Sequence, residues 1–362
     1  MIIGIDTSKA AKEARTGVEN FVYQLVLNLA KIDQHNTYFL YTNAPLPAEL
    51  KKQVNFIEKL NRQRRFWNCL FLPLSVLNAP CDVYLQSTDK IPWSANKKAV
   101  AVVHDLAYKY FPTAYSTSEK LRQLRTLKNY ARCAKKIICV SQSTKNDLIK
   151  YYPKLESKTE IVPLGYDPEK FHPFENPRDL LKIGCPYILY AGRIEERKNS
   201  LRLIRAFLKL KKENNIPHKL VLVGDPGFNF ESIFNLINGS GKYSSDIVLP
   251  GYINHDRLPE VIARADVFAF PTLYEGFGLA VLEALACGAA VVTSNTSSLP
   301  EIVGDAALLC NPEDENDIAR KIYQFIANKK LRQEYSVAAI KRAQYFSWTN
   351  TATQVLKILE KL

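Results

Sequence analysis

The chain has 362 residues, of which 47% are hydrophobic and 23% are charged, and its formal net charge is +13. This length and apolar content exclude a disordered chain and suffice for two domains of ordinary size. No apolar run reaches the roughly 20 residues that span a bilayer, and the start "MIIGIDT" has no basic segment or cleavage site typical of an export signal. Seven scattered cysteines without a C-x-x-C pair fit buried thiols in a reducing compartment. We therefore expect a folded cytoplasmic protein.

The positive charge is concentrated in the first half of the chain. Residues 1–172 carry 26 lysines and arginines against 15 acidic residues, a net charge of +11. The remainder carries 23 against 21, a net charge of +2. This asymmetry predicts that the first half faces an acidic partner.

Apolar, β-branched runs alternate along the chain with segments of helical spacing, which is typical of βαβ units and parallel sheets. The first series of predicted strands is "MIIGID", "TYFLYT", "VNFIEKL", "DVYLQST", "AVAVVHD", "KIICVSQS" and "TEIVPLGY". A second series follows with "YILYAGR", "KLVLVGD", "DIVLPGY", "DVFAFPT" and "AAVVTSN". The pattern predicts an α/β chain with two Rossmann-like, doubly wound domains.

A proline-rich segment separates the two series of strands. "PLGYDPEKFHPFENPRD" carries prolines at positions 163, 168, 173 and 177, which cannot continue a helix or a central strand. We therefore expect an N-terminal domain over residues 1–172 and a C-terminal domain over 173–345, which the resemblance described below assigns to the binding of the acceptor and of the donor, respectively. A closing helix within residues 346–362 is expected to pack back on the first domain. Two such domains would face a central cleft, with ligands beyond the carboxyl ends of their strands.

The stretch "YEGFGLAVLEALACG" combines a glycine-rich turn, an apolar helix and two glutamates, Glu275 and Glu283. Gly276 and Gly278 let the backbone approach a ligand where a helix presents unpaired N–H groups and its positive dipole end. We therefore predict a phosphate site. Glu283 lies about five residues into the helix, roughly 7 Å beyond its start at about 1.5 Å per residue, a distance suited to the hydroxyls of a ribose.

The Glu-x7-Glu spacing in this setting resembles the motif of retaining nucleotide-sugar glycosyltransferases with the GT-B architecture, in particular the large family numbered four. The resemblance implies that Glu275 lies against the hydroxyls of the donor sugar and that Glu283 lies against the ribose of the nucleotide. It extends over nearly the entire chain, because several other blocks agree.

"YAGRIEERKN" resembles the G-R-x-x-x-x-K-N block of the same family. The resemblance implies that Arg193 and Lys198 hold the donor diphosphate and stabilise it as it leaves. The physical reason is general, because two fixed cations offset the charge that develops on a departing nucleotide diphosphate.

Three further blocks resemble the family. "LPGYINHDRLPEVIARADVFAFPT" implies that Tyr252 and Ile253 pass beside the base, and "EARTGVENFVYQL" implies that Gly17 approaches the donor phosphate. "AVVHDLAY" resembles a segment of mannosyl- and rhamnosyltransferase-like members and implies that His104 lies in the cleft opposite Glu275. The predicted catalytic residues are Glu275, His104, Arg193 and Lys198. The predicted donor-binding residues are Gly17, Arg193, Lys198, Tyr252, Ile253, Glu275, Gly276, Phe277, Gly278, Leu279 and Glu283.

Each of these residues also has a purely structural interpretation. Glu275 and Glu283 fit a turn and a helix surface, Arg193 and Lys198 fit a solvated charge run, and His104 fits a buried histidine with satisfied hydrogen bonds. No metal or other cofactor is predicted, because no D-x-D follows an apolar strand and the acidic "NPEDEND" is explained by a helix start. The nucleotide sugar, GDP- or UDP-linked, is a substrate.

Two basic segments of the first half carry apolar side chains as well. "STSEKLRQLRTLKNYARCAKK", residues 116–136, predicts a basic amphipathic helix, and "KLNRQRRFWNCLFLPL" places cations directly before aromatic residues. Either segment fits a solvated face with core packing, or a surface that binds the acceptor or an anionic membrane. The residues predicted for that surface are Arg62, Arg64, Arg65, Trp67, Arg122, Arg125, Lys128 and Arg132. We expect peripheral association with the inner face of the cytoplasmic membrane.

The predicted function is retaining transfer of a hexosyl group, mannosyl-like, from a nucleotide sugar to a hydroxyl of a lipid-linked or polysaccharide glycan in cell-envelope polysaccharide biosynthesis. Two alternatives stay open: a nucleotide-sugar-binding protein without turnover, and a nucleotide-sugar epimerase or hydrolase on the same fold. A nucleic-acid-binding function is not favoured, because a groove binder has no use for a diphosphate site with two carboxylates.

Overall fold

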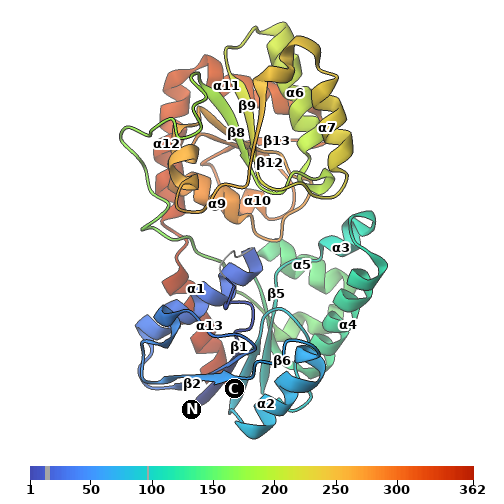
Figure 1. The fold of residues 1–362 in the computed structure, drawn as a ribbon, viewed down its shortest axis with the longest axis vertical. Helices are drawn as coiled ribbons and strands as arrows, with labels where there is room; N and C mark the ends of the chain where they lie inside the picture. The colour runs from blue at the N-terminus through green and yellow to red at the C-terminus, as the bar shows by residue number, and fades with distance from the viewer. Residues whose placement is uncertain (13–16, 96–97) are drawn as a thin grey trace. The chain divides into compact units, whose positions relative to one another are not determined.

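The computed structural model describes residues 1–12, 17–95 and 98–362. These residues form two compact units: unit 1 contains Met1–Gly165 and Ser347–Leu362, and unit 2 contains Tyr166–Phe346. Each unit has one parallel sheet with helices on both of its faces (Figure 1). The predicted fold class, two Rossmann-like α/β domains, is confirmed.

The sheet of unit 1 has the strand order β3-β2-β1-β4-β5-β6-β7, with all neighbours parallel. Its strands are β1 (Ile2–Asp6), β2 (Thr37–Thr42), β3 (Phe56–Leu60), β4 (Val83–Gln86), β5 (Ala99–Val103), β6 (Ala134–Cys139) and β7 (Thr159–Ile161). All seven coincide with predicted strands. The order reverses between β1 and β4, which is where open α/β sheets bind ligands beyond their carboxyl ends.

Helices cover both faces of this sheet. They are α1 (Gly17–Ile32), α2 (Leu72–Asn78), α3 (Ala107–Tyr110), α4 (Thr117–Cys133), α5 (Gln142–Tyr151) and α13 (Trp348–Glu360). Apolar side chains of α2, α4 and α5 form a buried cluster with the sheet. The closing helix α13 packs against α1, where the rings of Trp348 and Phe21 lie 6.2 Å apart (Figure 1).

The chain passes from unit 1 to unit 2 at Gly165, within the proline-rich segment that was expected to separate the two domains and before residue 172, the expected end of the first domain. The residues that follow Gly165 already contact unit 2, because Lys170 pairs with Asp256 at 2.7 Å. Gly165 itself is held against the start of α13: a Cβ added at this glycine would lie 2.1 Å from the backbone nitrogen of Trp348. The boundary therefore lies in the proline-rich segment, at a glycine that packs closely against the start of α13.

The sheet of unit 2 has the order β10-β9-β8-β11-β12-β13 and is parallel throughout. Its strands are β8 (Tyr187–Ala191), β9 (Lys219–Val223), β10 (Ile247–Gly251), β11 (Val267–Phe270), β12 (Val291–Ser294) and β13 (Leu308–Cys310). The first five were predicted, and β13 was not, because three residues give no readable alternation. This sheet reverses its order between β8 and β11.

The helices of unit 2 are α6 (Ser200–Glu213), α7 (Phe230–Asn238), α8 (Leu258–Arg264), α9 (Leu279–Ala286), α10 (Leu299–Val303), α11 (Glu315–Ala327) and α12 (Lys329–Ala343). Figure 1 shows α6 and α7 on one side of the sheet and α9 and α12 on the other. The acidic segment before α11 does start that helix, because the Asp314 side chain caps it by accepting the N–H of Asn316. Within the described residues, no helix combines the length and apolarity that crossing a bilayer requires.

Candidate active site

The loops that follow β8 and β11 are joined by hydrogen bonds at the point where the sheet of unit 2 reverses its order. The Asn199 side-chain amide donates to the carbonyls of Pro271 at 2.7 Å and Pro312 at 2.6 Å. The N–H of Leu273 donates to the carbonyl of Arg197 at 3.0 Å. Asn199 is the N-cap residue of α6 and has a left-handed backbone (φ 64°), which asparagine adopts more readily than most residues, while its side-chain amide serves the two loop carbonyls.

Lys198 and Glu275 meet across these two loops. The Lys198 ammonium donates a hydrogen bond to the Glu275 carboxylate, and the two side chains are only 15% and 12% exposed. The ring of Phe270 lies 5.3 Å from the ammonium, and the backbone N–H of Glu275 donates to the Ser297 hydroxyl at 3.1 Å. Two of the predicted catalytic residues are therefore in direct contact, and a solvated charge run does not describe Lys198.

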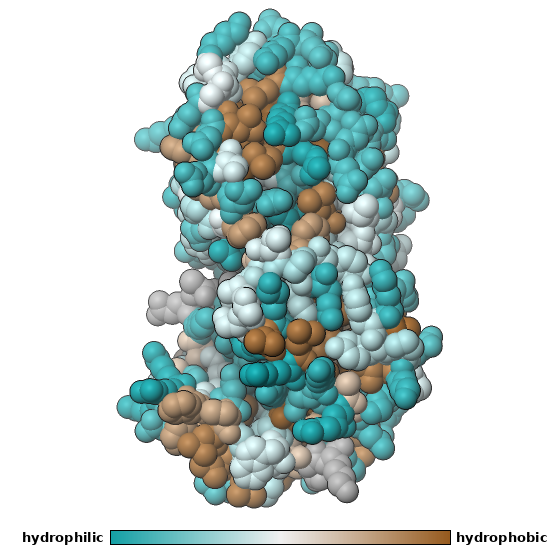
Figure 2. All heavy atoms as spheres, turned by 90° about the vertical axis from the view of Figure 1, so that its right-hand side faces the viewer, coloured by the Kyte–Doolittle hydropathy of each residue, from teal (hydrophilic) through white to brown (hydrophobic). Residues whose placement is uncertain are grey.

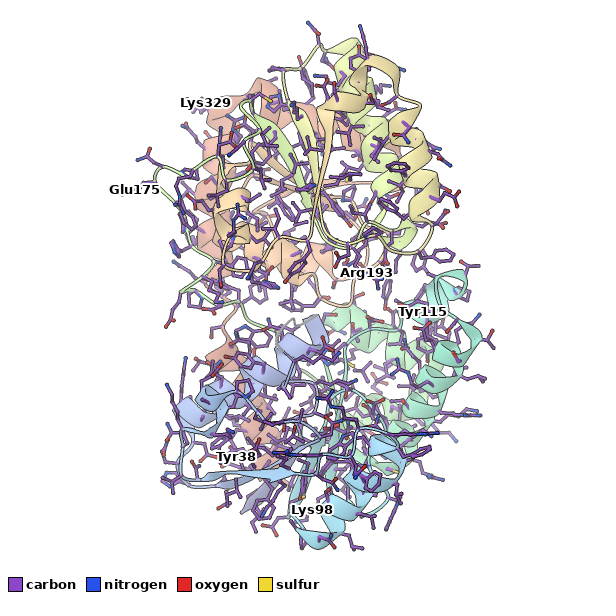
Figure 3. All side chains as sticks on the ribbon, in the orientation of Figure 1. Tyr38, Lys98, Tyr115, Glu175, Arg193 and Lys329 are labelled. Atoms are coloured by element: carbon purple, nitrogen blue, oxygen red, sulfur yellow. The ribbon has the colours of Figure 1, made fainter. Side chains whose placement is uncertain are left out.

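Arg193 lies at the same edge of unit 2 as α9 and α10 (Figures 1 and 3). Its side chain is 68% exposed, with Nε 4.0 Å from a Glu195 carboxylate oxygen, whereas Arg197 binds the other oxygen of Glu195 at 2.9 Å. The Tyr190 hydroxyl donates to the carbonyl of Arg193 at 2.7 Å and so fixes its backbone. The Arg193 guanidinium thus remains accessible to an anionic ligand.

Helix α9 begins at a glycine that no other residue replaces without strain. Gly278 has a φ of 103°, in the left-handed region, and an added Cβ would lie 2.6 Å from Leu299 Cδ2. The Ser298 hydroxyl donates to the carbonyls of Glu275 and Phe277 at 3.0 and 2.9 Å, which holds the turn before the helix. The predicted glycine turn and helix start are confirmed, and the positive end of the helix is suited to a phosphate.

Glu283 lies within α9 and is 9% exposed. Among the described residues, its carboxyl makes no hydrogen bond and no ion pair, and burial, with a smaller effect from the charge of Asp167, raises its pKa to about 8. A buried carboxyl without a partner is costly to folding. The helix-surface interpretation of Glu283 therefore does not hold.

The remaining predicted donor residues of unit 2 occupy different environments. Tyr252 is 53% exposed and Ile253 is buried, directly after the edge strand β10. Phe277 is buried and packs edge-on against Phe346 with 5.9 Å between ring centroids, whereas Leu279 is partly buried. Contacts of Tyr252 and Ile253 with a base stay a prediction.

Two predicted residues belong to unit 1. Gly17 is the first residue of α1. Residues 13–16, which open the predicted phosphate loop "EARTGVENFVYQL", lie outside the described residues. His104 follows β5; one ring nitrogen bonds the Ser87 backbone, and Nε2 is buried without a partner in the described residues. Burial lowers the pKa of His104 to about 4, so the ring is neutral at neutral pH. Its hydrogen bonds are therefore incomplete, unlike those of a satisfied core histidine.

The basic segments of unit 1 agree only partly with the predicted surface. Helix α4 ends at Cys133, before the predicted end at residue 136, because Ala134 starts β6. Its basic side chains are exposed: Arg122, Arg125, Lys128 and Arg132. Trp67 was wrongly assigned to this surface, since it is 4% exposed and belongs to the core cluster. The neighbouring Phe66, with a left-handed φ of 60° before the π-helical turn η2 (Trp67–Phe71), is 57% exposed instead.

Sequence reasoning missed the residues that position the cations. Glu195 and Arg197 form a pair beside Arg193, and Asn199 links three segments of the chain. Asn199 and Arg197 lie within the quoted "RIEERKN" block, so the signal was present, but the hydrogen-bonding partners of Asn199 lie 72 and 113 residues away in sequence.

Two doubly wound domains, one with cations and a helix start at its reversal point, are typical of enzymes that bind phosphorylated nucleotides. Residues 175–342 match the model of the family "Glycosyl transferases group 1", and residues 15–170 match that of "Glycosyltransferase Family 4". The O-antigen chain mannosyltransferase B of Escherichia coli is 32% identical over 276 residues, which are 74% of this chain and 71% of that protein. The chain therefore belongs to the group 1, family 4 glycosyltransferases and is a hexosyltransferase of the GT-B type.

Solved structures share this fold. Sucrose-phosphate synthase from Thermosynechococcus elongatus superposes with a TM-score of 0.76 at 20% identity, covering 99% of this chain and 98% of that one. HepE from Anabaena, solved in complex with UDP and glucose, gives 0.74 at 18% identity, covering 100% and 99%.

Proposed function

We propose that the chain transfers a mannosyl-like hexosyl group from a GDP- or UDP-linked donor to a hydroxyl of a glycan acceptor, lipid-linked or polysaccharide, with retention at the anomeric carbon. The observation that carries this proposal is the contact of Lys198 with Glu275 beside the start of α9, where the sheet of unit 2 reverses. The mannosyltransferase relative and the UDP complex of HepE support the choice of sugar and of donor class.

The proposed reaction uses fixed charges in place of a metal ion. The donor diphosphate binds the start of α9 together with Arg193 and Lys198. The Glu283 carboxylate accepts hydrogen bonds from the ribose hydroxyls, and the Glu275 carboxylate accepts one from a hydroxyl of the donor sugar. The bond from the anomeric carbon to the phosphate oxygen breaks, and the two cations offset the charge on the departing diphosphate. The acceptor oxygen bonds the same face of that carbon, and its proton passes to the leaving phosphate. No covalent enzyme intermediate forms.

A thermal-shift panel of UDP-, GDP-, ADP- and dTDP-sugars tests the donor site. The full chain is measured with EDTA and without added metal. A ligand at a hundred times its Kd stabilises the folded chain by about 2.7 kcal/mol, so we expect a clear shift with a UDP- or GDP-sugar. Absence of a shift with every nucleotide would refute the donor site, and a shift that needs a divalent metal would refute metal independence.

We also propose that unit 1 associates with an anionic membrane surface. The exposed apolar side chains near η2 and α2 are Phe66, Leu70 and Leu77, and the exposed cations before them are Arg62, Arg64 and Arg65. Figure 2 shows hydrophobic patches among hydrophilic side chains on the face of unit 1 that carries α4. Cations next to exposed aromatic and aliphatic side chains are typical of surfaces that bind anionic lipids.

Reversing the charge of Arg64 and Arg65 should weaken binding to phosphatidylglycerol vesicles by more than tenfold, because each basic residue near such a surface contributes about 1 kcal/mol. The measurement is co-sedimentation of the full chain with vesicles. Lys329→Glu/Lys330→Glu, an equal charge change on exposed residues of unit 2, is the matched control and should retain binding. Equal binding by the Arg64→Glu/Arg65→Glu variant, or no binding by the native chain, would contradict the membrane proposal.

A further inference from the structure

The chain from the end of β12 to the start of α10, residues 293–298, holds the turn that carries Glu275 through a series of hydroxyl groups. These hydroxyls form hydrogen bonds with the backbone between Phe270 and Phe277 and belong to Thr293, Ser294, Ser297 and Ser298. Three of the four residues are fully buried, whereas Ser297 is partly exposed. Side chains of this segment therefore brace the turn, which itself belongs to no helix or strand.

Ser297 has a backbone conformation that serine seldom adopts. Its φ is 53°, in the left-handed region, where a Cβ crowds the following carbonyl oxygen. Glycine would relieve this crowding, so the backbone conformation does not explain why a serine stands here. What serine adds is a hydroxyl, which accepts the backbone N–H of Glu275 at 3.1 Å. Backbone strain of this kind clusters at sites that bind or transform a ligand.

The hydroxyls of Ser297 and Ser298 hold the Glu275 backbone on both sides. Ser297 accepts its N–H, and Ser298 donates to its carbonyl at 3.0 Å. Within residues 1–12, 17–95 and 98–362, the Glu275 N–H has no other acceptor. Beyond this fixed backbone, the Glu275 carboxylate accepts a hydrogen bond from the Lys198 ammonium. A shift of roughly 1 Å in a catalytic group is enough to lower a rate about 10²-fold, so the placement of this backbone matters for the chemistry proposed for Glu275.

We propose that Ser297 is a positioning residue for Glu275. Its hydroxyl fixes the backbone N–H of the glutamate and so sets where the carboxylate meets a hydroxyl of the donor sugar. The proposal rests on the proposed sugar-transfer function, and it gives Ser297 no contact with the reacting atoms. Folding and turnover depend on different atoms of this residue, because the crowding comes from Cβ and the hydrogen bond comes from the hydroxyl oxygen.

Ser297→Gly and Ser297→Ala separate these two effects. Both variants remove the acceptor of the Glu275 N–H, so both should lower kcat/KM for the nucleotide sugar about three- to tenfold, the effect of one lost hydrogen bond. Only glycine relieves the left-handed strain, so Ser297→Gly should melt at a higher temperature than Ser297→Ala. A nucleoside diphosphate carries no donor sugar and should give both variants the same thermal shift as the native chain.

Lys182→Gly is the matched control. Lys182 has the same φ of 53° and is exposed in the loop that enters β8 at the amino end of the sheet, whereas the candidate site follows the carboxyl ends of the strands. The substitution relieves the same backbone strain away from the site and should leave kcat/KM at the native value.

Native kcat/KM in both Ser297 variants would overturn the positioning role. A loss in Ser297→Ala that Ser297→Gly does not share would also overturn it, because turnover would then follow the backbone strain rather than the hydroxyl. Weaker binding of the nucleoside diphosphate in both variants would show that the whole loop is disturbed, which contradicts an effect through Glu275. In each of these cases transfer by the native chain is retained, whereas absence of both nucleotide binding and transfer in the native chain would refute the proposed function itself.

Discussion

Replacing Lys198 by alanine is expected to lower kcat for sugar transfer about 10²- to 10³-fold, the usual effect of removing one group that stabilises developing charge. The ammonium is fixed by Glu275 and mostly shielded from water, so it needs little reorganisation when the diphosphate departs. The KM for the donor should rise less than kcat falls, because the charge on the leaving group increases toward the transition state.

The same substitution also breaks an ion pair, and the two effects can be separated. Loss of Lys198 leaves a mostly buried Glu275 carboxylate unpaired, and breaking such a pair costs about 3–5 kcal/mol when it is fully buried. Lys198→Ala should therefore melt earlier than the native chain, and Lys198→Ala/Glu275→Gln should recover much of that loss, while its kcat should lie well below that of Glu275→Gln alone, because Glu275 is itself predicted to bind the donor sugar. Lys212→Ala, on the exposed end of α6, should match the native chain in both measurements. A double variant with native turnover would contradict the role of Lys198.

Replacing Glu283 by glutamine is expected to stabilise the chain at alkaline pH and to weaken nucleotide binding. The pKa of Glu283 is raised from 4.5 to about 8 in the folded chain, so folding favours the protonated carboxyl. Ionisation in the unfolded chain therefore reduces stability as pH rises from about 4.5 to about 8, and the loss is complete above pH 8. Glutamine resembles the protonated form and removes this loss, which amounts to a few kcal/mol on the order of 1.4 kcal/mol per pKa unit.

The measurement is the difference in melting temperature between Glu283→Gln and the native chain across pH. It should be small near pH 5 and grow to several degrees near pH 9, whereas Glu334→Gln, on the exposed face of α12, should show no such trend. Nucleoside diphosphate binding should tighten with pH toward 8 in the native chain, because an ionised carboxylate accepts ribose hydrogen bonds more strongly. In Glu283→Gln that trend should vanish. A difference in melting temperature that does not change with pH would show that the Glu283 carboxyl is ionised in the folded chain throughout this pH range, and would contradict its raised pKa.

Much of the fold and of the geometry of the candidate site could be predicted from the sequence, because local patterns determine them. The central strands β4, β5, β8, β11 and β12 are buried along their whole length, as expected for parallel sheets covered on both faces, whereas the edge strands β3 and β10 are only partly buried. The start of α9 could be predicted because Gly276 and Gly278 indicate a tight turn directly before an apolar helical run. Glu275 and Glu283 stand out since apolar surroundings make a carboxylate costly.

What could not be predicted depends on residues far apart in the chain. Asp89 and Tyr108 line one cavity because β4 and β5 are neighbours in the sheet; Tyr108 ends the "AVVHDLAY" block, whereas Asp89 lies in no motif. Trp67 follows three arginines and so resembles an interfacial aromatic residue. In the structure Phe66 has a left-handed backbone, and the Phe66 side chain is exposed while the Trp67 side chain is buried. The proline-rich segment does hold the domain boundary, but the close packing of Gly165 against Trp348 joins residues far apart in the chain and follows from no local pattern.

The most direct test of the proposed function is the anomeric configuration of the product. The full chain is incubated without metal with the nucleotide sugar that the donor panel selects, labelled with carbon-13 at the anomeric carbon, and with methyl α-D-mannopyranoside as acceptor, and the reaction is followed by NMR. The expected product is a new glycoside with the configuration of the donor, with one nucleoside diphosphate released for each bond formed. An inverted glycoside would contradict retention, and free sugar or an epimerised donor as the sole product would contradict transfer.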